Sequence, residues 1–349
     1  MAQWKLILAY DGTAFHGWQV QPGLLTIQGI LADAIHRTVG ERVLPQGSGR
    51  TDAGVHALGQ VASFALAAAI PAANLHHALN RCLPPSIRIL SAELVAPEFH
   101  ARHSAIRKTY EYRIFPLRPA PKREPSLEVG PSFWPTARIS VVAPWDPTKL
   151  DPEPSNREPQ TCIDDRICPP TLAPFVWPCP WPLDVAALNQ AARHVLGTHD
   201  FTSFAATDPD LSTRATADCT SSTKEENCHS DPDPELAEGE ESPHFASATT
   251  NSPAKTSIRT IFQSCWHAQD GLLIYRVTAN GFLHHMVRNL VGTFVQAGAH
   301  RLDPDSVPAL LAARSRSAAG PTAPATGLFL VNVEYASPDN LQPATDNPE

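Results

Sequence analysis

The stretch GSGRTDAGVHALGQ, residues 47–60, places Arg50 and Asp52 in a loop that is otherwise poor in functional side chains. It could be no more than a tight turn, because glycine adopts backbone angles that other residues avoid and an aspartate can close a turn. On this stretch alone the turn is the favoured interpretation, because most clusters of Gly and Asp between apolar runs are turns. The rest of the chain decides whether Arg50 and Asp52 also have a chemical role.

The second candidate is Arg288, which lies in GFLHHMVRNLVGTFVQAG. The spacing of this stretch predicts a largely apolar, buried helix over residues 281–298. A buried arginine needs a carboxylate or a phosphate as its partner. The alternatives are a structural ion pair or a guanidinium that reaches water at a helix end. Adjacent helical residues face different directions, so His284 and His285 are not expected to bind one metal ion. We expect one of them in the core and the other near a cleft.

The third candidate is Tyr110 in RKTYEYRIF, which shares one face of a predicted strand with Tyr112. Ordinary strand packing explains either tyrosine alone. A basic strip beside exposed aromatic rings would instead suit a nucleic-acid backbone with a stacked base. The basic residues nearby are Arg102, His103, Arg107 and Lys108.

The chain lacks the common cofactor and nucleophile motifs. It has no phosphate-binding Gly-x-x-x-x-Gly-Lys loop, no Gly-x-Gly-x-x-Gly fingerprint, no His-Glu-x-x-His and no Gly-x-Ser-x-Gly. Its 7 cysteines show no Cys-x-x-Cys spacing, and Cys228-His229 has no second ligand pair, so no metal site is expected. Any chemistry is therefore assigned to Asp, Arg and Tyr side chains without a cofactor.

The elements that must position these residues form two similar halves of α+β type. In the first half, strands are predicted over residues 4–13, 60–66, 87–95 and 109–115, and helices over 26–40, with Thr26 as N-cap and Gly40 as stop, and over 71–83. In the second, helices are predicted over 184–197, 281–298 and 303–314, and strands over 257–268, 271–280 and 327–335.

Two stretches interrupt this pattern. Residues 116–182 hold 17 of the 35 prolines and are predicted to be a long irregular insertion. Residues 206–256 are acidic and poor in large apolar side chains, which predicts disorder. The predicted organisation is therefore a first half over 1–115, the Pro-rich insertion, a second half over 183–336 that contains the acidic insertion, and a flexible tail over 337–349.

The net charge of −8 does not exclude a nucleic-acid partner. Residues 208–255 carry 11 acidic and 3 basic residues, so this segment accounts for the whole imbalance and the remainder is neutral. A neutral body can still carry a basic cleft. The N-terminus does not resemble a signal peptide and no apolar run approaches membrane-spanning length, so we expect a cytoplasmic protein with reduced thiols and no membrane partner.

The chain resembles the tRNA pseudouridine synthase A family over nearly all of the length that is predicted to be ordered. Eight stretches match the family pattern in collinear order: YDGTAFHGWQVQP, TIQGILADAI, GSGRTDAGVHALGQVASF, FHARHSAIRKTYEYRI, GTHDFTSF, IRTI, GFLHHMVRNLVGTF and GLFLVNVEY. The resemblance implies the pseudouridine synthase fold, with two ferredoxin-like halves sharing a central mixed, mostly antiparallel sheet and helices packed on it. It also implies a homodimer with tRNA as partner.

The resemblance further implies site residues and an activity. Asp52 falls on the family's catalytic aspartate, Tyr110 on its active-site tyrosine and Arg288 on its active-site arginine. The implied reaction converts uridine to pseudouridine at positions 38, 39 and 40 of the tRNA anticodon stem-loop, with base flipping. A non-catalytic tRNA-binding protein or RNA chaperone on the same scaffold is the alternative. The residues expected to contact RNA are Arg50, His56, Arg107, Lys108, Tyr112, His284 and His285.

Overall fold

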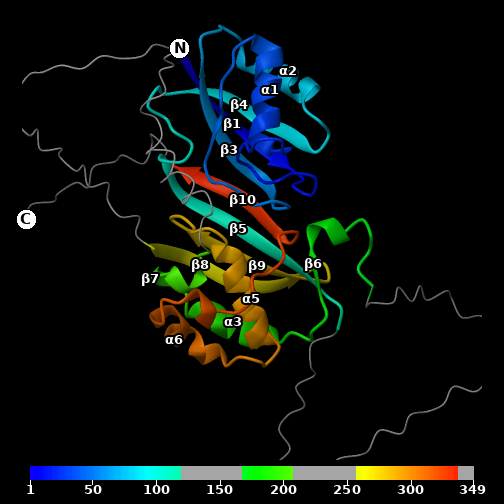
Figure 1. Cartoon of the computed structure of the whole chain (residues 1–349), viewed down its shortest axis with the longest axis vertical. Coiled ribbons are helices and arrows are strands. Elements are labelled where there is room, and N and C mark those ends of the chain that lie inside the picture. Colours follow the sequence, from blue (N-terminus) through cyan, green and yellow to red (C-terminus); the bar gives the residue numbers. More distant parts are fainter. Residues whose placement is uncertain (119–166, 207–256, 337–349) are drawn as a thin grey trace, which may run out of the picture.

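The computed structural model describes residues 1–118, 167–206 and 257–336. Within these ranges, one mixed sheet of ten strands runs through the molecule (Figure 1). The strands are β1 (Ala2–Tyr10), β2 (Gln46–Gly47), β3 (His56–Leu66), β4 (Ile87–Val95), β5 (Ala105–Pro116), β6 (Trp177–Cys179), β7 (Gly197–Asp200), β8 (Ile258–Gln269), β9 (Leu272–Ala279) and β10 (Leu328–Tyr335).

Helices accompany both halves of this sheet (Figure 1). The α-helices are α1 (Ile27–Val39), α2 (Ala72–Cys82), α3 (Val185–Arg193), α5 (Met286–Gly298) and α6 (Val307–Ala312). Short 3₁₀ turns are η1 (Ala173–Phe175), η2 (Thr202–Phe204), η3 (Pro304–Ser306) and η4 (Arg316–Ala318). No helix in the described ranges combines the length and apolar character needed to cross a bilayer.

The sheet topology confirms the predicted α+β class and the mixed, mostly antiparallel sheet. The main strand order is β4-β1-β3-β10-β5-β9-β8-β7, with β2 paired to β3 and β6 paired to β5. Only the β10–β3 and β5–β6 pairings are parallel among the described strands. The order β4-β1-β3-β2 in the first half and β10-β5-β9-β8 in the second each follow the fourth-first-third-second pattern of a ferredoxin-like βαββαβ unit.

The structure differs from the predicted boundaries between the halves. By pairing, β5 belongs to the second half, since its neighbours are β10 and β9, so a boundary at residue 115 falls one strand too late. The Pro-rich stretch is also not irregular throughout. Residues 177–179 form β6 on the edge of β5, and both Val176 and Cys179 are fully buried. Three segments lie outside the described residues: 119–166 of the Pro-rich stretch, 207–256 of the acidic stretch, and the tail, 337–349.

Local signals placed several elements correctly. The Thr26 side chain accepts a hydrogen bond from the Gly29 amide, and Gly40 ends α1 with a φ of 77°, as predicted. The strand predicted over residues 87–95 is β4 itself. The helix predicted over 281–298 begins only at Met286, because His285 takes a left-handed conformation with a φ of 58°. This change places the two histidines before the helix rather than on it.

Candidate functional site

The loop that carries Asp52 is pressed against the loop after β1. The Trp18 amide donates to the Thr51 carbonyl at 3.0 Å, and the Gly54 amide donates to the Phe15 carbonyl at 3.3 Å. A Cβ at Gly17 would lie 2.5 Å from the Thr51 carbonyl oxygen, closer than any side chain tolerates. Because Gly17 has no side chain, the loop after β1 can contact the backbone of Thr51, the residue before Asp52. The turn predicted for this stretch is present, and it holds a carboxylate in a fixed place.

Side chains from the sheet hold the rest of the loop. Gln60 accepts from the Ser48 hydroxyl at 2.7 Å and donates to the Gly49 carbonyl at 2.9 Å. Lys108 donates from Nζ to the Ser48 carbonyl at 2.5 Å. Burial lowers the pKa of Lys108 to about 8, with Arg102 adding to the effect. The prediction that Lys108 contacts RNA is untested, and its observed contact is with the loop that carries Asp52.

Arg288 reaches Asp52 from the first turn of α5. Its Nη1 donates to Asp52 Oδ2 at 3.0 Å, and its Nε donates to the Ala323 carbonyl at 2.8 Å. The two side chains are 16% and 21% exposed, so the pair is largely but not fully shielded from water. The N-terminus of a helix also favours a nearby carboxylate. The anionic partner that Arg288 was expected to need is therefore the Asp52 carboxylate, 236 residues away in the sequence.

Both histidines before α5 lie at the same carboxylate. His285 Nε2 is 3.2 Å from Asp52 Oδ2, and His284 Nε2 is 3.5 Å from Asp52 Oδ1. The two imidazole rings lie in contact, with centroids 3.9 Å apart and their planes tilted by 31°. The prediction that the histidines face different directions, one of them in the core, is wrong because neither is helical. Burial lowers the pKa of His285, although Asp52 opposes the shift. Asp52, His284 and His285 could together hold a metal ion.

Tyr110 lies beside this group and is buried. Its ring meets Phe282 edge-on at 5.0 Å, and its hydroxyl lies 4.0 Å from where a Cβ at Gly49 would stand. Burial raises the pKa of Tyr110, and Tyr10 and Asp52 raise it further. Only 7% of Tyr110 is accessible, so of the two interpretations that the sequence left open, packing within the sheet describes this residue better than an exposed ring. Tyr110 is a neutral phenol that packs beside the loop carrying Asp52.

Two residues expected to contact RNA are buried instead. His56 is 1% exposed, and its ring stacks on Phe329 at 4.7 Å. Its Nδ1 accepts from the Gly12 amide at 3.1 Å, so Nε2 carries the proton and donates to the Pro174 carbonyl. Tyr112 is fully buried and its hydroxyl donates to the Pro324 carbonyl at 2.8 Å. Both predictions are corrected, because these side chains stabilise the sheet and the loops beside it.

Arg107 and Lys108 do not form one basic strip. Successive residues of β5 point to opposite faces of the sheet, and Arg107 lies over the ring of Phe262 at 4.6 Å, away from the face of Tyr110. Arg107 lines a groove with residues of β8, β9 and β10. Any contact of Arg107 with RNA would be on a different surface from Asp52.

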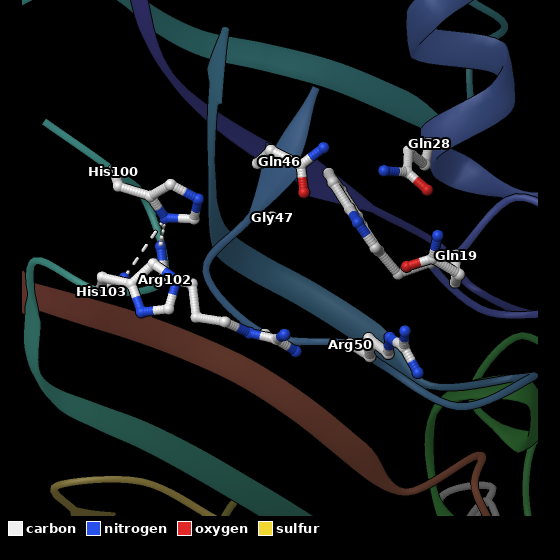
Figure 2. Close-up of a pocket in the computed structure, with 10 residues that line it drawn as sticks. Gln19, Gln28, Gln46, Gly47, Arg50, His100, Arg102 and His103 are labelled. Carbon is white, nitrogen blue, oxygen red and sulfur yellow. Dashed lines mark hydrogen bonds between the residues drawn. The ribbon is translucent and has the colours of Figure 1, made fainter. Parts of the chain in front are cut away.

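Arg50 lines a shallow pocket beside the Asp52 loop (Figure 2). Figure 2 shows Arg50, Arg102, His100 and His103 along one side of this pocket, with glutamine side chains along the other. The His100 Nδ1 accepts hydrogen bonds from the Arg102 and His103 amides, at 3.1 and 3.3 Å. No acidic residue is among the described residues that line the pocket. The pocket is therefore a basic surface next to the loop that carries Asp52.

Sequence reasoning missed several contributors to the site. Phe282, Gln60 and the Ala323 carbonyl each contact a residue of the Asp52–Arg288–Tyr110 group or its loop. Gln60 and Phe282 lie inside recognised stretches, but nothing in a linear pattern indicates that Gln60 turns back onto its own loop. The Ala323 carbonyl has no sequence signal, because every residue type, proline included, supplies a backbone carbonyl oxygen.

Comparison with known proteins gives a consistent result. A family model described as tRNA pseudouridine synthase matches residues 6–104 and 239–336. The chain is 39% identical to tRNA pseudouridine synthase A of Solibacter usitatus, over 96% of this chain and 100% of that protein. It is 36% identical to the protein of that name from Moorella thermoacetica, over 95% of this chain and 98% of the relative. For the Maridesulfovibrio salexigens protein the identity is 35%, over 96% and 91%. The chain belongs to the tRNA pseudouridine synthase family.

Proposed function

We propose that this protein isomerises uridine to pseudouridine in the anticodon stem-loop of tRNA, at positions 38, 39 and 40, and that Asp52 is its catalytic carboxylate. The observation that carries the proposal is the Asp52–Arg288 pair, which joins the glycine-rich loop of the first half to α5 of the second at 3.0 Å. Family membership supports the reaction, and the resemblance of the motifs supports the anticodon stem-loop as the target.

The reaction breaks the bond between C1′ of the ribose and N1 of the base, rotates the base, and joins C1′ to C5. The C5 proton leaves and N1 gains a proton, so the change is redox-neutral. A carboxylate can serve such a reaction as a nucleophile at the sugar or the base, or by promoting a glycal-type intermediate. Asp52 has the required access, because its side chain is 21% exposed at the end of a loop with few other side chains.

Arg288 contributes by holding Asp52 in its ionised form and in one orientation. A guanidinium 3.0 Å from a carboxylate oxygen favours the charged form of that carboxylate. The Nε bond to Ala323 fixes the guanidinium from its other side. When uridine leaves the helical stack, Arg288 is the cation best placed to contact the nucleotide that enters. It would therefore serve both Asp52 and the substrate.

Tyr110 is suited to pack on the flipped base. Its raised pKa keeps the phenol protonated near neutral pH, so it is poorly suited to remove the C5 proton. The base would instead pack against the accessible part of the Tyr110 side chain, beside the Asp52 loop. The structure thus favours the packing role over the proton-transfer role that a tyrosine could also fill.

RNA phosphates would meet the basic pocket beside the catalytic loop. Arg50 and Arg102 line it together with His100 and His103 (Figure 2). Arginines and backbone amides near a catalytic loop position the nucleic acid without reading its sequence. Arg50 is two residues from Asp52, so a phosphate held there would lie close to the reacting nucleotide.

Tritium release from C5-labelled uridine in an anticodon-arm RNA tests the proposal. The wild-type protein is expected to release tritium, and Asp52→Asn to lose at least about a thousandfold in rate while keeping its RNA affinity. If the wild-type protein bound the RNA but released no tritium, the non-catalytic RNA-binding alternative would be correct. If Asp52→Asn lost RNA binding as well, Asp52 would have a structural rather than a catalytic role.

The proposal also includes a cytoplasmic homodimer as the active form, and only the family resemblance supports this part. The expected result is a dimer in sedimentation equilibrium at the concentrations used for turnover. A monomer with full activity would remove the dimer from the proposal and leave the reaction unaffected.

A further inference from the structure

Three side chains with metal-binding atoms converge at the catalytic position. Asp52 offers a carboxylate oxygen, and His284 and His285 each offer an imidazole nitrogen, with all three ligand atoms within 4.8 Å of one another. The histidines are brought there by the left-handed backbone at His285, which places both rings before α5 rather than around it. In the described part of the chain this group is the one cluster of its kind.

The spacing suits a transition-metal ion such as Zn²⁺. With metal–nitrogen and metal–oxygen bonds of about 2.0–2.1 Å, two ligands of a tetrahedral site lie about 3.3–3.4 Å apart. The closest carboxylate–imidazole distances here are 3.2 Å between Asp52 Oδ2 and His285 Nε2 and 3.5 Å between Asp52 Oδ1 and His284 Nε2, so the two distances involve different oxygens of one carboxylate. Two neutral imidazoles and one carboxylate form a ligand set that zinc accepts, with one position left for water. Each of the three side chains is between 21% and 31% exposed, so an ion could enter from solvent.

The surroundings indicate an exchangeable ion rather than a resident cofactor. The Arg288 guanidinium lies 3.0 Å from Asp52 Oδ2 and would repel a bound cation. His284 Nδ1 is buried and has no hydrogen-bond partner among the described residues. Resident metal sites usually hold the second nitrogen of each histidine with a carboxylate or carbonyl. A site with an opposing cation and an incomplete outer shell binds metal weakly.

We propose that Asp52, His284 and His285 form an exchangeable binding site for Zn²⁺ or a similar transition-metal ion, whose occupation blocks the Asp52 carboxylate. The binding part of this inference stands on the geometry alone. The blocking part rests on the proposed function, because it requires Asp52 to be the catalytic group. Divalent transition metals would then act as reversible inhibitors that compete with the flipped nucleotide for one carboxylate.

The metal itself is the probe for the binding part. The full chain, freed of metal by a chelator, is titrated with Co²⁺, whose visible absorption reports a tetrahedral site, and Zn²⁺ then displaces it. Binding to cysteines would be recognised by a thiolate charge-transfer band in the ultraviolet. We expect His284→Gln and His285→Gln each to weaken binding by at least about tenfold. His100→Gln, which alters another pair of neighbouring histidines, His100 and His103, is the matched control and should bind Co²⁺ as the wild type does.

Arg288→Gln makes the test specific to this position. Removing the opposing cation should tighten Co²⁺ and Zn²⁺ binding while turnover falls, a combination that general damage to the fold would not produce. Equal metal affinity in the wild type, His284→Gln and His285→Gln would overturn the proposal. So would weaker binding in Arg288→Gln, provided that its circular dichroism matches the wild type.

Turnover measurements test the blocking part separately. Micromolar Zn²⁺ should slow tritium release by the wild-type protein, and an excess of chelator should restore it. If Zn²⁺ bound at these residues without slowing turnover, the blocking part would be wrong and the binding site would stand. If no turnover occurred in any preparation, the proposed function would fail while the Co²⁺ titration still decided whether the site exists.

Discussion

The Asp52–Arg288 pair should contribute measurably to the stability of the fold. Exposed ion pairs contribute about 0.2–1 kcal/mol, whereas breaking a fully buried pair costs about 3–5 kcal/mol. With side-chain exposures of 21% and 16% and a separation of 3.0 Å, this pair falls between those cases. We therefore expect a coupling free energy of about 1–3 kcal/mol between the two side chains.

A double-mutant cycle measures this coupling. Asp52→Asn preserves the shape of the side chain, and Arg288→Met preserves much of the length of its stem. Arg288→Met also loses the bond to Ala323, but that loss occurs with either residue at position 52 and cancels in the cycle. Urea unfolding followed by tryptophan fluorescence is a suitable assay, because Trp4 and Trp18 are buried in the first half.

A second cycle provides the control. Lys5 and Glu93 are 2.9 Å apart, but Glu93 is 48% exposed, so Lys5→Met and Glu93→Gln should couple by less than about 1 kcal/mol. A coupling at Asp52–Arg288 below about 0.5 kcal/mol, or no larger than at the control pair, would refute the reasoning. In that case the contact would be a weak surface pair, and Arg288 would have to act on the substrate without holding Asp52.

Three further predictions follow from neighbouring contacts. Lys108→Met should slow turnover by about tenfold or more, because the Ser48 carbonyl loses the hydrogen bond from Nζ. Arg107→Met, on the opposite face of the sheet, should leave turnover unchanged. Equal turnover rates for the two variants would contradict this prediction. The free energy of unfolding should fall as pH drops below about 6.5, because burial lowers the pKa of His56 in the folded state and the unfolded chain then binds more protons. Urea unfolding at pH 7.5 and 5.5 should show a smaller pH effect in His56→Gln, and an unchanged effect would refute the assignment. Gly292→Ala should destabilise the protein by about 2 kcal/mol or more, because its Cβ would lie 1.7 Å from the Pro321 carbonyl oxygen. Gly281→Ala is the control, since its Cβ would meet only an ordinary contact at 3.6 Å. Similar melting temperatures for the two variants would contradict this prediction.

The sequence indicated most of the elements and the principal charged pair. Capping residues and hydrophobic periodicity placed α1 and β4 because those signals act over a few residues, as with Thr26 and Gly40. The apolar helix around Arg288 predicts an anionic partner for this residue. The motif resemblance assigns Asp52 and Arg288 to the same active site. The structure supplies the distance and exposure of this pair, which decide its energy.

What could not be predicted depends on contacts between distant segments. Which face of β5 packs against the Asp52 loop and how deeply it is buried follow from contacts with distant strands, so the burial of Tyr112 had no local signal. The separation of Arg107 from Lys108 follows from strand alternation only once β5 is known to begin at Ala105. The start of α5 at Met286 depends on a left-handed histidine, which periodicity cannot show. The prolines around β6 suggested irregular structure, yet the strand forms because it pairs with the end of β5 over residues 114–116, beyond the part of β5 that pairs with β10.

Mapping of pseudouridine in a tRNA transcript treated with the purified protein tests the central claim most directly. An unmodified transcript with uridines at positions 38, 39 and 40 is incubated with the wild-type protein or with Asp52→Asn, and each uridine is then assayed for conversion. The account predicts pseudouridine at those positions with the wild-type protein and none with Asp52→Asn. Conversion by Asp52→Asn at the wild-type rate would contradict the assignment of Asp52, and the absence of pseudouridine with the wild-type protein would contradict the proposed reaction.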